Sequence, residues 1–362
     1  MGECPAGVKP RSSLPTRIFP LRALSGYVRR LHAIWVGVRD TPSRGQDSRW
    51  PWEIPFAGWL DVLVRTRRKT FEEHLTLLAS GIAYQAFLTL VPAVVAIALI
   101  YGMIAEPARV ARDMAALIDI VPGGGQALLT ERLISGMGSR RRDLIGIAST
   151  VLLTLYTAAL FARSVMAAMN IVYHQSRRPR FLKRWAVAAA IAISGGLFML
   201  MALCGIALLG YVQTLLPNGT PLLWSAVRIG FWTAMAAAAG AGFMLIYRYA
   251  PARADARWAW CVPGALAATL LWLAATYGFG VYVANFARYD ATYGSLAAVV
   301  VLQVWMFLSA VSLLLGARLN VELELQTMLD TTTGTPMPIG QRGATAADRV
   351  EAGTLSSQQN DT

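Results

Sequence analysis

Three polar residues with long or strongly hydrogen-bonding side chains lie inside stretches of the sequence that are mostly apolar. Arg163, Asn170 and Gln303 have side chains that can contact a solute as it crosses a membrane. Arg163 and Asn170 are seven residues apart, so on a helix they share one face. Charged and polar groups within apolar helices are rare, and they often mark a substrate or ion pathway. We therefore predict a substrate pathway that includes these three residues.

Each of the three also has a structural interpretation. Arg163 lies about nine residues from the end of its apolar stretch, which is only about 13 Å of helix, so its long side chain can reach the membrane surface. Asn170 fits equally well at that surface. A lone amide such as Gln303 most often bonds a neighbouring helix. The sequence leaves these alternatives open.

Arg318 and Glu322 have opposite charges and are four residues apart, close to the end of the last apolar stretch. On a helix this spacing brings the two side chains together. We predict that they form a pair at the helix end. An exposed pair of this kind contributes about 0.3–0.5 kcal/mol.

The residues that enzymes use for acid–base, nucleophilic or metal chemistry are scarce and scattered. The three histidines, His32, His74 and His174, are far apart, and no carboxylate lies in the middle of an apolar stretch. We find no metal-ligand spacing, nucleophile motif or phosphate-binding loop. The sequence predicts a protein that is not an enzyme and that has no cofactor, catalytic residue or metal site.

Composition identifies the environment of the chain. Apolar residues make up 56% of the 362 residues and charged residues only 15%, with a mean hydropathy of +0.47. Between Asp143 and Asp255 there is no Asp or Glu. A lipid bilayer explains such a long stretch without carboxylates, because an ionised group in its core costs roughly 2.5–3.5 kcal/mol.

Six apolar stretches are each long enough to cross a bilayer as a helix, which requires roughly 20 residues. They lie near residues 77–104, 144–172, 185–213, 222–247, 262–284 and 295–320. The prediction is an all-α membrane bundle over residues 57–325, with a further interfacial helix at about 57–73. We expect its polar face to carry Arg65, Arg67, Arg68 and Lys69. The flanking segments 1–56 and 326–362 are predicted to be mostly disordered, with an amphipathic helix possible in the first.

The distribution of Lys and Arg predicts the orientation. Basic residues are concentrated before the first stretch and in the second and fourth connections, whereas the third connection, 213–221, has none. By the positive-inside rule, both termini are expected in the cytoplasm of a bacterium, with the protein in the inner membrane. Arg140, Arg141 and Arg142 oppose this assignment, since they end a connection that should be external. That connection, 105–142, is expected to form two short amphipathic helices.

Several motifs, in the same order, resemble those of a known family. They are His74-Leu-Thr-Leu-Leu-Ala-Ser-Gly-Ile-Ala-Tyr84, Tyr247-Arg-Tyr-Ala-Pro251, Asn285-Phe-Ala-Arg-Tyr-Asp-Ala-Thr-Tyr-Gly-Ser295 and Leu315-Gly-Ala-Arg-Leu-Asn320. Over roughly residues 58–325 the chain resembles the YihY / virulence factor BrkB family of bacterial inner-membrane proteins. The family pattern has Glu where this chain has Arg318, and an apolar residue at Gln303. Glu322 is placed to compensate for the charge reversal.

The resemblance implies transport or envelope functions, including movement of lipids or other amphiphiles, and offers no catalytic residue. The old ribonuclease BN label of the family is not supported by these residues. We predict a permease-like protein for a lipid, amphiphile or other anionic solute. The alternative is a non-transporting envelope assembly or scaffold protein. Expected partners are membrane lipids, with a homo-oligomer or envelope proteins possible and no nucleic acid.

Overall fold

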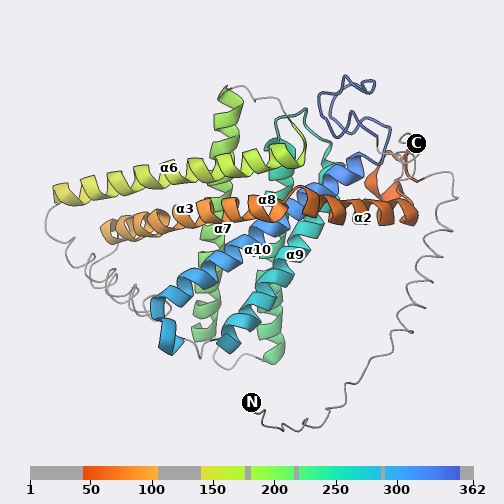
Figure 1. Cartoon of the computed structure of the whole chain (residues 1–362). Coiled ribbons are helices and arrows are strands. Elements are labelled where there is room, and N and C mark those ends of the chain that lie inside the picture. The colour runs from red at the N-terminus through yellow and green to blue at the C-terminus, as the bar shows by residue number, and fades with distance from the viewer. Residues whose placement is uncertain (1–43, 105–139, 176–180, 216–219, 287–289, 351–362) are drawn as a thin grey trace, which may run out of the picture. The chain divides into compact units, whose positions relative to one another are not determined.

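The computed structural model describes residues 44–104, 140–175, 181–215, 220–286 and 290–350 (Figure 1). Within these ranges the chain is all-helical, and its only extended pairing is an isolated bridge between Ala256 and Thr332. The amphipathic helix considered within residues 1–43 and the two helices expected in the first connection lie outside the described residues.

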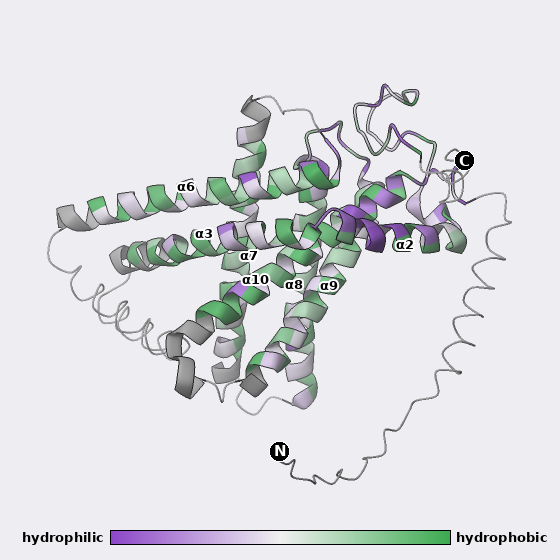
Figure 2. Cartoon of the chain, in the orientation of Figure 1, coloured by the Kyte–Doolittle hydropathy of each residue, from purple (hydrophilic) through white to green (hydrophobic). Residues whose placement is uncertain are grey.

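Six long helices match the six predicted stretches. They are α3 (Leu75–Ile104), α6 (Arg140–Val172), α7 (Phe181–Leu215), α8 (Pro221–Tyr249), α9 (Trp258–Phe286) and α10 (Asp290–Glu324). Each contains a segment long and apolar enough to cross a membrane. Hydrophobic residues predominate in the described parts of these helices, with hydrophilic residues between them and at the end of α10 (Figure 2). The prediction of six spans is confirmed, and most of the helices extend a few residues beyond the apolar stretches.

The helices contact one another in a closed cycle: α3 packs on α6, α6 on α7, α7 on α8, α8 on α9, α9 on α10, and α10 on α3. Helix α10 also contacts α6 and the short helix α2 (Phe56–Glu72). Thus α10 has neighbours from four other helices. It contributes several residues to the core, among them Leu314, Ala317 and Val321.

The core occupies one end of the helices. This end, which we call the charged end, contains Leu75, Val172, Tyr249, Trp258 and Glu324. In α6 to α10, the buried residues lie from the midpoint of the helix to the charged end, among the side chains that the structure describes. Helix α3 is the exception, because it also buries Pro92 and Ala96. The opposite halves, which we call the far end, have mostly exposed apolar side chains.

A short helix precedes the first span and differs from the prediction in its orientation. Helix α2 (Phe56–Glu72) begins within one residue of the predicted interfacial helix and packs on α10. Arg65, which we expected on the polar face, is 2% exposed, whereas Leu63 and Val64 are 51% and 54% exposed. The expectation was wrong for Arg65. Its charge can be buried because it is neutralised by Glu322 of α10, which lies 257 residues away in the sequence.

The segment after α10 also differs from the prediction. We expected disorder from residue 326 onward, but residues 326–350 fold against the charged end. Arg257 N donates to the Thr331 carbonyl at 2.9 Å, and Ala254 N donates to the Gly343 carbonyl at 3.2 Å. The small side chains of Ala344, Ala346 and Ala347 are buried. Low hydrophobicity favoured disorder, yet backbone pairing with the loop before α9 and burial of small side chains order this segment. Residues 351–362 lie outside the described residues.

Candidate functional site: a buried charge network

The charged end contains a network of ion pairs that is almost completely removed from solvent. Arg318 Nη2 and Glu322 Oε1 are 2.5 Å apart, and Arg65 Nε and Glu322 Oε2 are 2.8 Å apart. The side chains of Arg65, Arg318 and Glu322 are at most 2% exposed. Each oxygen of the Glu322 carboxylate thus faces a different guanidinium. The spacing of Arg318 and Glu322 correctly indicates that they pair, but the pair is buried in a network rather than isolated at the membrane surface.

Two further groups extend the network to the turn between α2 and α3 and to the end of α6. Arg318 Nη1 lies 3.0 Å from Glu73 Oε1, 3.2 Å from His174 Nε2 and 3.4 Å from the carbonyl of Val172. Glu73 and His174 are 3.3 Å apart. His174 has a φ of 51°, a left-handed conformation just beyond the last residue of α6. The Arg318 guanidinium of α10 therefore contacts the turn between α2 and α3 and the end of α6.

A second buried pair joins the loop before α9 to the end of α10. Arg253 donates two hydrogen bonds to Glu324, at 2.6 and 2.8 Å, and lies over the ring of Tyr173 at 4.3 Å. Burial alone would lower the pKa of Arg253, but the Glu324 carboxylate raises it well above its ordinary value. Burial raises the pKa of the Tyr173 hydroxyl. Arg253 is therefore cationic and Tyr173 neutral at physiological pH.

Hydrogen bonds between one side chain of α10 and the backbone of α9 hold these two helices together. Pro263 lies inside α9 and lacks an N–H. Near it, Asn320 of α10 accepts from Gly264 N at 2.8 Å and donates to the Cys261 carbonyl at 3.3 Å. A glycine is required here, because a Cβ on Gly264 would lie 2.2 Å from the Gly316 carbonyl oxygen. The two helices therefore meet at their backbones.

The predicted pathway residues lie in different surroundings. Arg163 is exposed on α6, and its guanidinium lies 5.3 Å from the centre of the Trp185 ring. Asn170 Oδ1 accepts from Ala252 N at 2.7 Å and so anchors the loop after α8. These placements correspond to the structural interpretations of the two residues. No hydrogen bond or ion pair among the described residues joins either of them to Gln303.

Gln303 is partly buried in the far half of α10. Its Oε1 atom is buried and has no hydrogen-bond partner in the described part of the chain. Gln85 of α3, which the sequence reasoning did not select, has the same property. A buried amide oxygen without a partner is costly, so both atoms are expected to bind water or a polar ligand group. The signal for Gln85 was its position as an amide inside the first apolar stretch.

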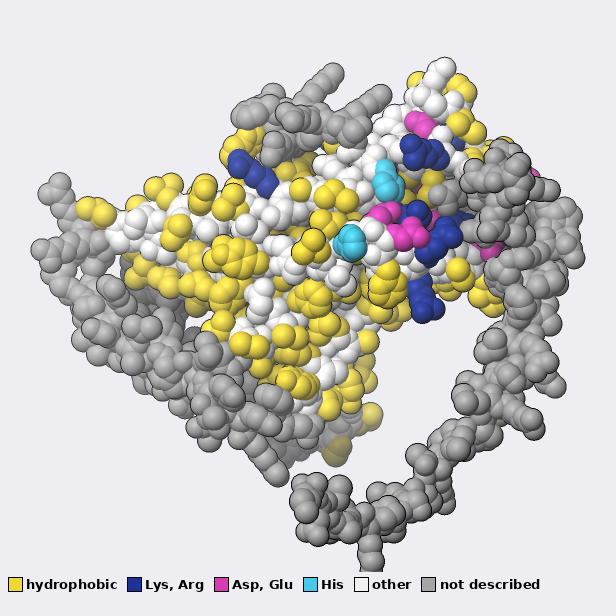
Figure 3. All heavy atoms as spheres, viewed as in Figure 1, with side chains coloured by type: hydrophobic (Ala, Val, Ile, Leu, Met, Phe, Trp, Pro, Cys, Tyr) yellow, Lys and Arg dark blue, Asp and Glu magenta, His cyan; other side chains and the backbone are white. Residues whose placement is uncertain are grey.

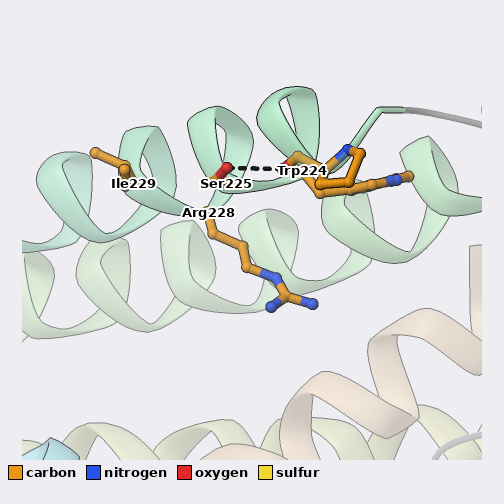
Figure 4. Close-up of a pocket in the computed structure, with 5 residues that line it drawn as sticks. Trp224, Ser225, Arg228 and Ile229 are labelled. Atoms are coloured by element: carbon orange, nitrogen blue, oxygen red, sulfur yellow. Dashed lines mark hydrogen bonds between the residues drawn. The ribbon is translucent and has the colours of Figure 1, made fainter.

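An open pocket lies at the far end, along the first turns of α8 (Figure 4). Its volume is about 520 Å³, and Pro221, Trp224, Ser225, Arg228 and Ile229 line it. Ser225 Oγ donates to the Pro221 carbonyl at 2.7 Å, whereas the exposed Arg228 side chain extends away from its own helix (Figure 4). All of the described residues that line the pocket belong to α8, so they do not enclose a binding site.

The sequence reasoning missed most members of the network. From the sequence, Arg65 is predicted on the polar face of the interfacial helix, and nothing marks Arg253, Glu73, His174 or Glu324 as members of a site. The sequence does show carboxylates close to the ends of the apolar stretches. It cannot show their partners on other helices, because residue spacing predicts contacts only within one helix. Charged side chains gather where α2 meets the ends of the long helices (Figure 3). Chemically, these groups can hold the helix ends together and can exchange partners, since several of them share Arg318 and Glu322.

Arg342 holds the C-terminal segment in place, and its removal should release that segment. Its guanidinium donates to the carbonyls of Met328, Leu329, Met337 and Ala347 at 2.7–3.2 Å. In Arg342→Ala, hydrogen exchange across residues 326–350 should accelerate about tenfold or more, because several charge-assisted bonds are lost. Mass spectrometry of the exchanged peptides measures this rate. The exposed Arg349→Ala is the matched control, and equal exchange in the two variants would contradict the role of Arg342.

The C-terminal segment should also loosen in acid. Partial burial alone would raise the pKa of Asp330, but bonds from the Met337 and Thr332 backbone, the Thr332 hydroxyl and the charge of Arg342 hold it below its ordinary value of 3.8. The carboxylate therefore stabilises the segment above pH 3.8, and this contribution is lost as pH falls through the lowered pKa. In that pH range the protection of the Met337 amide, which is the factor by which it exchanges more slowly than in an unfolded peptide at the same pH, should fall in the native chain. In Asp330→Asn the Met337 amide should already be poorly protected at neutral pH. If its protection at neutral pH equalled that of the native chain, the Asp330 carboxylate would not hold the segment.

Together the six spans and the network define a polytopic helical membrane protein. The virulence factor BrkB family model matches residues 66–338, and the chain belongs to this family. This confirms the resemblance seen in the motifs.

The chain is also similar to curated relatives called UPF0761 membrane proteins. One from Xanthomonas campestris pv. campestris (strain B100) is 28% identical over 261 residues, which are 70% of this chain and 58% of the relative. One from Aeromonas salmonicida (strain A449) is 28% identical over 265 residues, covering 68% of this chain and 83% of the relative. The chain thus spans little more than half the length of the Xanthomonas relative. No solved structure matches it.

Proposed function

We propose that this protein is permease-like and moves a lipid, an amphiphile or another anionic solute across the bacterial inner membrane. The observation that supports this most is the one-sided core. The spans pack tightly at the charged end, whereas at the far end their side chains are mostly exposed. A transporter that alternates between two states needs one end closed while the other is open. The one-sided core supports the proposal because such a state, with the charged end closed, requires this arrangement.

Polar groups in the spans support the same proposal. The buried Oε1 atoms of Gln303 and Gln85 are available to a polar ligand group, as no protein partner is present among the described residues. Exposed Arg228, near the start of α8, adds a positive charge at the far end. The net charge of +13 favours an anionic solute. By the positive-inside rule, the charged end and both termini face the cytoplasm.

A second proposal is a non-transporting envelope scaffold, which would act without catalysis. It is favoured by Arg163 and Asn170, whose partners within the chain explain them without a solute. The folded segment 326–350 offers a further surface to which an envelope protein or a second copy could bind. Under this proposal, the far ends of the spans contact lipid or a partner rather than a transported solute.

Flux through the purified full-length chain distinguishes the two proposals. The protein is reconstituted in vesicles, and two probes are followed. The first is fluorescent phosphatidylglycerol, which dithionite added outside quenches once the lipid reaches the outer leaflet. The second is carboxyfluorescein, which reports movement of an anionic solute. Transport predicts protein-dependent movement of at least one probe, and Gln303→Leu should reduce it. Gln175→Leu makes the same change outside the spans and should have no effect. Rates equal to those of empty vesicles for both probes would favour the scaffold.

A further inference from the structure

Helix α2 has two apolar faces, and only one of them is covered. Gly58, Val62 and Arg65 lie on the side that packs against α10. The opposite side, which we call the outer face, contains Phe56, Leu63, Val64, Arg67 and Phe71. These positions recur at helical spacing, so they form one stripe roughly half a turn away from the buried one.

The outer face has more large apolar side chains than a helix face in contact with water normally has. Phe56 is 73% exposed, Phe71 68%, Val64 54% and Leu63 51%. Two exposed tryptophans lie just before the helix in the chain. Trp50 and Trp52 are stacked with ring centres 5.3 Å apart, and they are 40% and 65% exposed. Tryptophan is enriched where protein meets the boundary between membrane and water.

The position of α2 places this face at that boundary. The helix leads through the turn at His74 into α3, a span, and its buried side contacts α10, which is another span. Arg65 fixes it to Glu322 and Gln326, at the last turn of α10 and just beyond it. A helix attached to the ends of two spans lies beside the headgroup layer, where an apolar face is covered by lipid.

The charges of the outer face determine which lipid fits. Arg67 lies within the apolar stripe and has no hydrogen-bond or ion-pair partner among the described residues. Its neighbours Arg68 and Lys69, by contrast, both pair with Glu72, at 3.5 and 3.0 Å. Guanidinium groups bind phosphate oxygens well, often with two parallel hydrogen bonds. An acyl chain beside Phe56 and Leu63 with a phosphate on Arg67 uses both features of the surface.

We propose that the outer face of α2 lies in the membrane surface and binds an anionic phospholipid through Arg67. This inference requires that the chain be a membrane protein, but it does not depend on transport. It gives the short helix a role as a lipid-bound anchor, which holds the buried charge network at the ends of the spans.

The lipid preference is tested with the full chain and two probes, phosphatidylglycerol and phosphatidylcholine. Native mass spectrometry measures the affinity of each. Arg67→Gln should weaken phosphatidylglycerol binding about fivefold and leave phosphatidylcholine unchanged. The matched control is Arg68→Gln, which removes the same charge one position away and should change little. An unchanged affinity in Arg67→Gln, or equal losses in both variants, would overturn the proposal.

The depth of the face is tested separately with spin labels at Leu63→Cys and Asp61→Cys. The native cysteines are replaced first, as Cys4→Ser, Cys204→Ser and Cys261→Ala. In vesicles, the label at position 63 should be accessible to oxygen, which partitions into lipid, and the label at position 61 to a water-soluble nickel complex. Nickel access at both positions would overturn lipid contact. Shielding of position 63 from both reagents would also overturn it, and would point to a protein partner instead.

Discussion

Replacing Glu322 with glutamine should destabilise the protein by about 3–5 kcal/mol, the largest effect that we expect from any single change in the network. The substitution preserves the shape of the side chain and removes only its charge. Arg65 and Arg318 would then be buried with less negative charge to offset them, because Glu322 contacts both at 2.5–2.8 Å. Thermal unfolding in detergent, followed by circular dichroism, should show a midpoint lowered by about 10 °C.

Two further variants separate the charge effect from a general effect of losing a carboxylate. Glu72→Gln removes an exposed carboxylate that also pairs with basic residues, and should leave the unfolding midpoint nearly unchanged because solvent screens that pair. Adding Arg65→Met to Glu322→Gln removes one of the two cations and should recover part of the loss, since apolar replacement of a buried ion pair is often tolerated. If Glu322→Gln unfolded at the same temperature as Glu72→Gln, the network would not stabilise the charged end.

The second large effect is expected at the contact between α9 and α10. In Gly264→Ala, the new Cβ would lie 2.2 Å from the Gly316 carbonyl oxygen and 2.4 Å from Asn320 Oδ1. Both neighbours are held in the core, so the helices must separate and the bonds from Asn320 to Gly264 and Cys261 must weaken. We expect a loss of about 2–3 kcal/mol or more, measured by the same thermal unfolding.

Gly278→Ala is the matched control on the same helix. A Cβ at Gly278 meets nothing within 4 Å, and alanine favours the helix over glycine by about 1 kcal/mol in water. This variant should therefore unfold at or slightly above the temperature of the native chain. If the two variants behaved alike, the close approach of α9 and α10 would not contribute to stability.

The sequence alone determined where the spans lie. A bilayer excludes unpaired charge and requires about 20 apolar residues for each crossing, so the six stretches were visible in the order of residue types. The motifs from His74 to Asn320 were also sufficient to identify the family, because their order and spacing are properties of the sequence. The pairing of Arg318 with Glu322 followed from a local rule, since four residues make about one helical turn.

What only the tertiary structure decided is which charged residues are partners. Arg65 and Arg253 resemble ordinary basic residues at the ends of spans, yet one binds Glu322 and the other Glu324 across separations of 257 and 71 residues. The orientation of α2 and the folding of residues 326–350 follow from the same contacts. A charge can be buried only when a partner neutralises it, and for Arg65 and Arg253 that partner is far away in the sequence, which contains no local sign of it.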